Sequence, residues 1–309
     1  MGHANPLDGS RRRQRRERAI RGVFLAAGLS SMAISVAIVL SLLGESVSFL
    51  RNIELGSLTE SGWYPRLGKY DLGTLFVGSL IVTGVAMLIA TPLGLGAAVY
   101  LAEYAPSRVR RILKPILEIL AGIPSIVLGF FAFRWIAPKI VQRMSEDAGL
   151  FSLMSAGIGV GILVTPLVAS ITEDALRAVP RTLREASYGI GARRATTTLR
   201  VVFPAAISGI VASLILAASR AIGETMVVAL AAGGSGSTQF TTNPFDEGQT
   251  ITAAMASLAS GTDNVAAGGG QGAGAAFQSL FFLGLLLFLI TLVLNFIGDR
   301  FVARIQERY

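Results

Sequence analysis

Long apolar runs without charged residues limit what this sequence can fold into. One run extends from Val23 to Leu43, and another lies between Asp71 and Glu103. A helix needs about 20 apolar residues to cross the hydrocarbon layer of a membrane. Only 15% of the residues are charged, whereas a soluble domain carries about 25%. The sequence therefore predicts an all-α, polytopic membrane protein.

Six segments have the composition of transmembrane helices. In chain order they are Val23–Leu43, the run between Asp71 and Glu103, Pro115–Ala137, Leu150–Ile171, Ala205–Ala232 and Phe277–Ile297. The third is the weakest, because Gly122 and Pro124 interrupt it. The expected organisation is a basic cytoplasmic tail (1–22), a first transmembrane helix (23–44), a periplasmic loop (45–72), a permease core (73–299) and a cytoplasmic C-terminal tail (300–309). The core contains a basic loop (177–204) and a glycine-rich periplasmic loop (233–276).

The distribution of positive charge predicts the topology. Most of the 27 Lys and Arg residues lie in the two tails and in the loops after the second and fourth spans. Cytoplasmic segments of membrane proteins carry this excess. We therefore expect a multi-pass protein of the inner (cytoplasmic) membrane with both termini in the cytoplasm. The net charge of +8 then reflects topology and contact with membrane lipid, and no nucleic-acid partner is expected.

The composition also argues against chemistry by this chain alone. It has no cysteine and one histidine, His3, which excludes thiolate nucleophiles, histidine triads and clustered histidine ligands. We expect no catalytic residues, no metal site and no bound cofactor, and hence a protein that is not itself an enzyme.

The basic loop 177–204 has a helical pattern. After Pro180, Arg181 to Tyr188 can form two helical turns, which Gly189 and Gly191 would end. A second helical piece can follow from Ala192 toward Phe203. A short helix of this kind suits insertion into a groove on another protein. The alternative is a loop that serves topology only.

The same loop resembles the EAA signature of ABC-importer permeases. That signature reads EAA, three residues, G, nine residues, I, one residue, L and P. The matching positions are Glu185, Ala186, Ser187, Gly191, Val201, Phe203 and Pro204, with every spacing kept and mild departures at Ser187, Val201 and Phe203. The resemblance implies a type I ABC importer (MetI-like) permease fold and a coupling helix that docks into an ATPase subunit. This chain has no G-x-x-x-x-G-K-[ST] phosphate loop, so ATP and Mg are expected on a separate ATPase dimer.

Two charged residues interrupt the fifth predicted span. Arg220 and Glu224 are four residues apart, so on one continuous helix they would share a face. Each costs about 2.5 to 3.5 kcal/mol in the centre of a membrane, and such residues often mark a substrate route. A guanidinium can hold two oxygens of a tetrahedral anion. The alternative is an ion pair that only fixes helix packing.

A closer resemblance extends over several segments. They are RAIGETM (Arg220–Met226), TPLGLGAAVYLAEYAP (Thr91–Pro106), LEILAGIPSIVLGFFAF (Leu117–Phe133) and the C-terminal LLLFLITLVLNFIGDRFVARIQERY. These are similar to the permease subunits of phosphate-specific ABC importers, nearer the C-type than the A-type subunit. The resemblance implies phosphate passage past Arg220 and Glu224. It also implies a heterodimer with an A-type permease subunit and a periplasmic phosphate-binding protein.

Other functions stay open from the sequence. One is import of another oxyanion, such as phosphonate or molybdate. A second is a secondary transporter or channel that works without an ATPase, and a third is a membrane scaffold that transports nothing.

Weaker patterns concern packing and the outer loop. Gly157 and Gly161 form a G-x-x-x-G that would let two helices approach closely. In the outer loop, the segment GGGQGAG is expected to be flexible. Ile251–Ala259 is expected to form a short interfacial or re-entrant helix.

Overall fold

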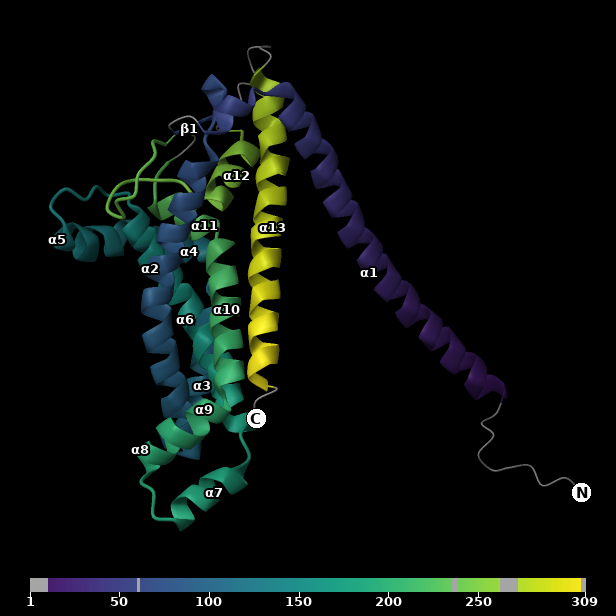
Figure 1. The fold of residues 1–309 in the computed structure, drawn as a ribbon, viewed down its shortest axis with the longest axis vertical. Coiled ribbons are helices and arrows are strands. Elements are labelled where there is room, and N and C mark those ends of the chain that lie inside the picture. The colour runs from purple at the N-terminus through teal and green to yellow at the C-terminus, as the bar shows by residue number, and fades with distance from the viewer. Residues whose placement is uncertain (1–10, 60–61, 235–237, 262–271, 307–309) are drawn as a thin grey trace, which may run out of the picture.

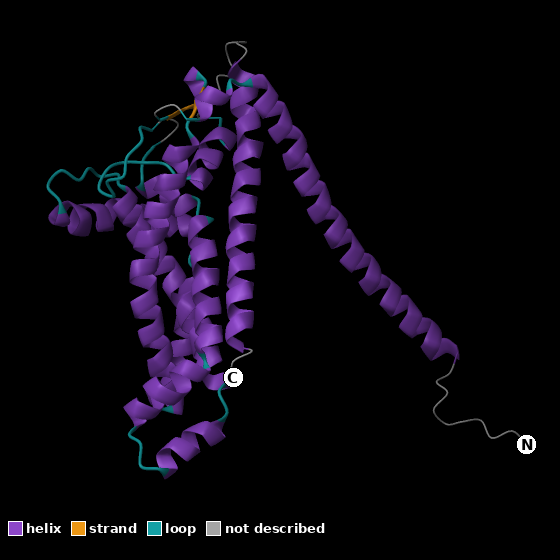
Figure 2. Ribbon diagram, in the orientation of Figure 1, coloured by secondary structure: helices purple, strands orange, loops and turns teal. Residues whose placement is uncertain are grey.

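The computed structural model describes residues 11–59, 62–234, 238–261 and 272–306. Figure 2 shows that this part of the chain is mostly helical, with a short two-stranded hairpin and several loops at one end. The expected all-α class is therefore confirmed. Helix α7 projects from one end of the bundle, and the hairpin lies at the opposite end (Figure 1). We call these the loop end and the hairpin end.

The elements follow in chain order. The α-helices are α1 (Arg11–Asn52), α2 (Leu72–Val99), α3 (Ser107–Ala121), α4 (Ser125–Phe131), α5 (Gln142–Met144), α6 (Leu153–Ala178), α7 (Arg181–Gly189), α8 (Arg194–Thr197), α9 (Phe203–Ala205), α10 (Ile207–Ile222), α11 (Met226–Ala231), α12 (Ile251–Ala259) and α13 (Gly272–Gln306). The π-helical segments are η3 (Tyr100–Tyr104), η4 (Ala132–Val141) and η5 (Thr198–Val202). The 3-10 turns are η1 (Leu55–Leu58) and η2 (Pro65–Leu67), and the strands are β1 (Trp63–Tyr64) and β2 (Lys69–Tyr70).

The centre of the bundle is the contact between α2 and α6. A Cβ on Gly157 would lie 2.6 Å from the Cβ of Val85, and one on Gly161 would lie 3.1 Å from the carbonyl oxygen of Ala86. Because glycine has no side chain, the two helix backbones can approach closely at these positions. The close helix approach predicted from G-x-x-x-G is confirmed.

Helix α1 leaves the bundle along most of its length (Figure 1). It meets α13 near the hairpin end, where Gln278 donates a 2.9 Å hydrogen bond to Ser48 and accepts one of 3.1 Å from Asn52. The N-terminal end of α1 and the C-terminal end of α13 both point toward the loop end. An even number of crossings is consistent with this arrangement.

A second core lies at the hairpin end. Trp63 of β1 pairs with Tyr70 of β2, and both are buried with Phe49 of α1. The predicted helix Ile251–Ala259 is confirmed as α12, which packs into this core. Most of the GGGQGAG segment lies outside the described residues.

Among the described residues, five helices are long and apolar enough to cross a membrane. The bent pair Arg194–Ala205 and Ile207–Ile222 makes a sixth if it counts as one span, which is the predicted number. Two of the predicted spans nevertheless have the wrong course. The expected continuous span Pro115–Ala137 is wrong, since α3 ends at Ala121 and α4 begins at Ser125. Pro124 cannot continue a helix through Gly122, because its ring removes a donor and disfavours helical backbone before it. The span-like segment there is Ser125–Met144.

The fifth predicted span, Ala205–Ala232, is also divided. Helix α10 ends at Ile222, and α11 begins only at Met226. The chain between them carries Glu224, so the division changes the geometry of the expected site.

Candidate functional site

The basic loop 177–204 forms the helix that projects at the loop end. Pro180 precedes α7, which runs Arg181–Gly189 as expected from its sequence. The chain then turns at Gly191, whose φ of +81° suits glycine. The amide of Gly191 donates to the carbonyl of Tyr188 at 2.9 Å, and that of Ala192 donates to Ser187 at 3.1 Å. These bonds satisfy carbonyls at the end of α7.

The first three signature residues divide into two environments. Glu185 and Ala186 are exposed on α7. Ser187 is buried, and its hydroxyl lies 2.8 Å from that of Thr197 in α8. The serine that departs from the signature therefore ties the two arms of the loop together, and it leaves its neighbours free to contact another molecule.

The remaining signature residues lie on the returning arm. Val201 is half-buried in η5, and Phe203 and Pro204 are half-buried in α9. Between them Val202 is fully buried against the ends of α2 and α6. The whole motif is thus one structural unit, a projecting helix with a base fixed to the bundle.

Exposed apolar side chains accompany the motif on α7 and its turn. Leu183 and Tyr188 are exposed, and Ile190 is 87% exposed. Exposed apolar groups beside charged ones are typical of surfaces that contact a partner.

The predicted pairing of Arg220 and Glu224 on one helical face is wrong. Arg220 lies in the last turn of α10, whereas Glu224 follows the end of that helix at Gly223. No ion pair or hydrogen bond of the Arg220 side chain is found among the described residues, and that side chain is exposed. The predicted alternative of a self-compensating ion pair is therefore not what this structure shows.

Glu224 lies in a break between two helices. It is 8% exposed, and its carboxylate accepts a long 3.5 Å hydrogen bond from the amide of Val227. Its main-chain carbonyl accepts a 2.7 Å bond from the hydroxyl of Thr252 in α12. The break is closely packed, since a Cβ on Gly129 of α4 would lie 2.9 Å from the carbonyl oxygen of Met226. This site joins α10, α11, α12 and α4.

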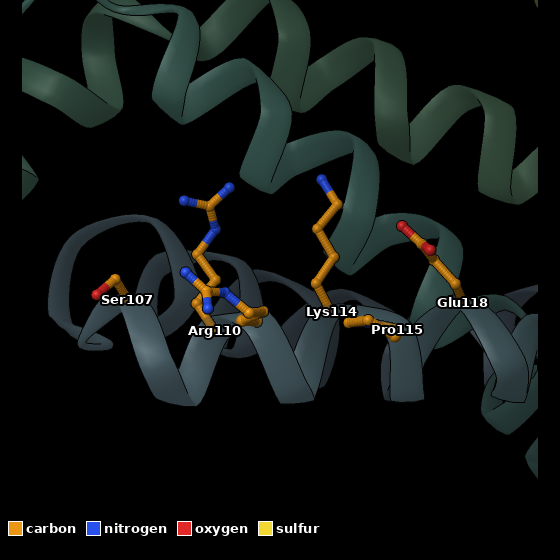
Figure 3. Close-up of a pocket in the computed structure, with 6 residues that line it drawn as sticks. Ser107, Arg110, Lys114, Pro115 and Glu118 are labelled. Carbon is orange, nitrogen blue, oxygen red and sulfur yellow. The ribbon is translucent and has the colours of Figure 1, made fainter.

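A second charged cluster surrounds Glu173, near the end of α6. Its buried carboxylate is paired with Arg110 at 2.9 Å, Lys114 at 2.7 Å and Arg177 at 3.5 Å. Figure 3 shows Arg110 and Lys114 pointing from α3 toward the neighbouring helix. The pocket beside them is lined by Ser107, Arg110, Arg111, Lys114, Pro115 and Glu118.

This cluster fixes the charge of Lys114. Desolvation by burial lowers the pKa of Lys114, but hydrogen bonds and charges from Asp174 and Glu173 outweigh it and raise the pKa above its ordinary value. Lys114 therefore stays protonated, and it fastens α3 to the end of α6.

Sequence reasoning missed two buried carboxylates at the loop end, Glu103 and Glu173. Glu103 follows one long apolar run, and Glu173, next to Asp174, follows another, so that position was the available signal. Arg177 is a local partner of Glu173. The other basic partners, Arg184 of Glu103 and Arg110 and Lys114 of Glu173, come from distant segments, so nothing local in the sequence identifies those pairings. Among the described residues, no group of three or more His, Cys, Asp or Glu side chains is placed to hold a metal ion.

The fold and the site define a class: a polytopic membrane permease subunit with a projecting helical loop. The family model described as "Binding-protein-dependent transport system inner membrane component" matches residues 90–309. The chain belongs to this family, and it is a multi-pass protein of the inner membrane.

Individual relatives agree with this assignment. The chain is 35% identical to the probable ABC transporter permease protein YqgH of Bacillus subtilis over 79% of this chain and 80% of the relative. It is 32% identical to the phosphate transport system permease protein PstC of Mesorhizobium japonicum over 92% of this chain and 89% of the relative. A chain of the MetNI methionine ABC transporter, solved in inward-facing conformations, has a similar fold, with a TM-score of 0.55 at 20% identity, over 74% of this chain and 93% of that one. The predicted type I (MetI-like) permease fold is confirmed.

Proposed function

We propose that this chain is the membrane-spanning permease subunit of an ATP-driven importer of inorganic phosphate. The family, and the relatives that are phosphate transport permeases, support the class and the substrate. The observation that carries the proposal is Arg220, exposed beside a break in a predicted membrane span and without a side-chain partner among the described residues.

The physical argument begins with the cost of that arginine. A guanidinium in contact with lipid is unfavourable by about 2.5 to 3.5 kcal/mol, so it requires an aqueous route or a facing chain. An anion in such a route supplies the missing hydrogen-bond acceptors. Arg220 would therefore hold phosphate oxygens on the route between this chain and a homologous A-type permease subunit.

Glu224 would contribute selectivity. Phosphate keeps a proton at neutral pH, so its P–OH group can donate a hydrogen bond to the carboxylate, whereas sulfate has no proton and would be repelled. Discrimination of this kind rests on an unfavourable contact with the wrong substrate.

The loop 177–204 would couple transport to ATP. Glu185 and Ala186, exposed on α7, would contact the ATPase subunit, which carries ATP and Mg as a dimer. On this proposal the loop end would face the cytoplasm, together with the N-terminal end of α1 and the C-terminal end of α13. A phosphate-binding protein would deliver substrate to the hairpin end.

Labelled phosphate uptake into proteoliposomes, with the complete complex and its binding protein, tests this function. Arg220→Gln is expected to lower ATP-dependent uptake by about 100-fold, which corresponds to loss of about 3 kcal/mol of charged hydrogen bonding. Glu224→Gln is expected to lower the preference for phosphate over sulfate. Glu118→Gln, a change of an exposed acid away from the break, is the control.

Three results would overturn the proposal. Normal phosphate uptake by Arg220→Gln, together with an unchanged preference of Glu224→Gln for phosphate over sulfate, would remove both residues from the route. Uptake of molybdate or phosphonate in preference to phosphate would assign another oxyanion, and uptake without an ATPase would indicate a secondary transporter.

A further inference from the structure

A buried ion pair joins the projecting helix to the bundle. Arg184 of α7 donates to the same carboxylate oxygen of Glu103 from Nη2 at 2.8 Å and from Nε at 3.2 Å. The side chains are 16% and 4% exposed. Glu103 lies in η3, the π-helical end that follows α2. Single-turn π segments of this kind are frequent at functional positions in helices.

The same guanidinium also holds the end of α6. Its Nη1 donates to the carbonyl oxygen of Val179 at 2.7 Å, and its Nη2 donates to that of Leu176 at 2.8 Å. These carbonyls belong to the last turn of α6 and its cap, where helical partners are missing. One rigid donor fork therefore connects α7, η3 and α6, which a lysine could not do with the same geometry.

The returning arm of the loop is attached at the same place. Arg194 of α8 donates to the main-chain carbonyl of Glu103, and its guanidinium lies 5.1 Å from the centre of the Tyr104 ring. Both arms of the loop thus meet at one turn of η3.

Helix α6 leads from this junction to the break at Glu224. A Cβ on Gly159 would lie 2.9 Å from Cγ1 of Val227 and 3.0 Å from Cβ of Ala132. Close contacts along α6 therefore extend from the end that Arg184 holds to the segment that follows Glu224.

We propose that Arg184 and Glu103 are positioning residues for ATP coupling, which hold α7 and the ends of α2 and α6 together as one moving body. This inference rests on the proposed function, because it assigns how force from an ATPase would reach the bundle. It predicts that the pair persists through the cycle.

A distance measurement tests the pair without reference to the substrate. The chain has no cysteine, so spin labels can be placed specifically at Thr182→Cys on α7 and Leu93→Cys on α2, both exposed positions. In the assembled complex we expect one narrow distance distribution that stays the same with and without ATP. Glu103→Gln and Arg184→Gln are expected to broaden it. Arg181→Gln, on the same helix and exposed, is the matched control.

A transport measurement tests the consequence. In Arg184→Gln the phosphate moved per ATP hydrolysed is expected to fall about tenfold, within the range of coupling energies between sites. ATP hydrolysis should continue in this variant. The Glu103→Gln/Arg184→Gln double variant should move as much phosphate per ATP as the more severe single variant, because the two residues act through each other.

Three outcomes would overturn the inference. The first is a spin-label distance in the native complex that changes when ATP is added. The second is a native-like distance distribution in Glu103→Gln and Arg184→Gln, and the third is a double variant whose loss of phosphate moved per ATP equals the combined losses of the two single variants. If Arg184→Gln fails to assemble, Glu103→Gln, which preserves shape, decides by the same measurements. If the native complex hydrolyses ATP but moves no phosphate, the proposed substrate is wrong, and the distance measurement still decides on the ion pair.

Discussion

Tyr70 illustrates what burial does to a single polar residue in this molecule. Its ring packs edge-on against Phe49 and Trp63, with centroid distances of 5.0 and 5.7 Å. Its hydroxyl is buried and has no hydrogen-bond partner among the described residues. Desolvation by this burial raises the pKa of Tyr70 to about 12. The ring stabilises the hairpin end, whereas the hydroxyl does not.

Replacing Tyr70 by Phe is therefore expected to preserve stability or raise it by about 1 kcal/mol, since an unsatisfied buried hydroxyl is unfavourable. A raised pKa also means that the neutral tyrosine contributes its full stability below pH 10. That contribution is lost as the pH rises toward 12. Thermal unfolding of the purified protein at pH 8 and pH 11 measures both effects. A large loss of stability in Tyr70→Phe at pH 8 would show that the hydroxyl has a partner.

Individual residues also show which parts of the site could be predicted. The turn at Gly191 and the start of α7 after Pro180 follow from local backbone preferences, so the sequence predicted them correctly. The relation of Arg220 to Glu224 depends on whether the helix continues through Gly223, and average hydropathy over a span carries no information on that. Glu103 and Arg184 are 81 positions apart, so their contact arises only from the tertiary fold.

At the scale of elements, the contact between α2 and α6 rests on positions that have no side chain. A Cβ on Gly94 would lie 2.7 Å from Cβ of Val168, and one on Gly157 would be similarly close to Val85. A Cβ on Gly84, by contrast, would meet no atom within 4 Å outside its own stretch of helix. Gly94 and Gly157 therefore allow the close contact, whereas Gly84 has no part in it.

Gly157→Ala is expected to destabilise the protein by about 1 to 3 kcal/mol, because the added methyl group would force the helices apart. Gly84→Ala is the matched control, and it is expected to be neutral or stabilising by up to about 1 kcal/mol through helix propensity. Thermal unfolding of the two variants in the same detergent makes the comparison. Equal stabilities would mean that α2 and α6 do not pack as closely as the structure shows.

The helix breaks have a common cause at this scale. Pro124 divides α3 from α4, and Gly223 ends α10. Both lie in segments apolar enough to be counted as continuous spans, so composition alone misplaces them. The sequence does contain the residues that break the helices, but packing decides whether a membrane helix kinks or ends.

At the scale of the whole molecule, composition predicts the helical bundle. It does not predict the charged contacts and the helix break that connect the helices. Apolar runs predicted six spans, which the described residues match when the bent pair Arg194–Ala205 and Ile207–Ile222 is one span. Pro180 and the glycines after Tyr188 predicted the short helix of the loop 177–204. The charged junctions at Glu103 and Glu173 lie at the loop end, and the break at Glu224 lies toward the other end of α10. Helix α6 connects the two regions. A motion that begins at α7 thus has a physical path to the proposed phosphate route.

The most direct test of this account measures uptake of labelled phosphate into proteoliposomes that hold the complete complex and its binding protein. Uptake is compared with and without ATP, for the native chain and for Glu185→Ala. The account predicts uptake only with ATP in the native complex. It predicts a large loss in Glu185→Ala, because exposed α7 would no longer engage the ATPase. Phosphate flux without ATP, or full ATP-driven uptake by Glu185→Ala, would contradict coupling through the loop.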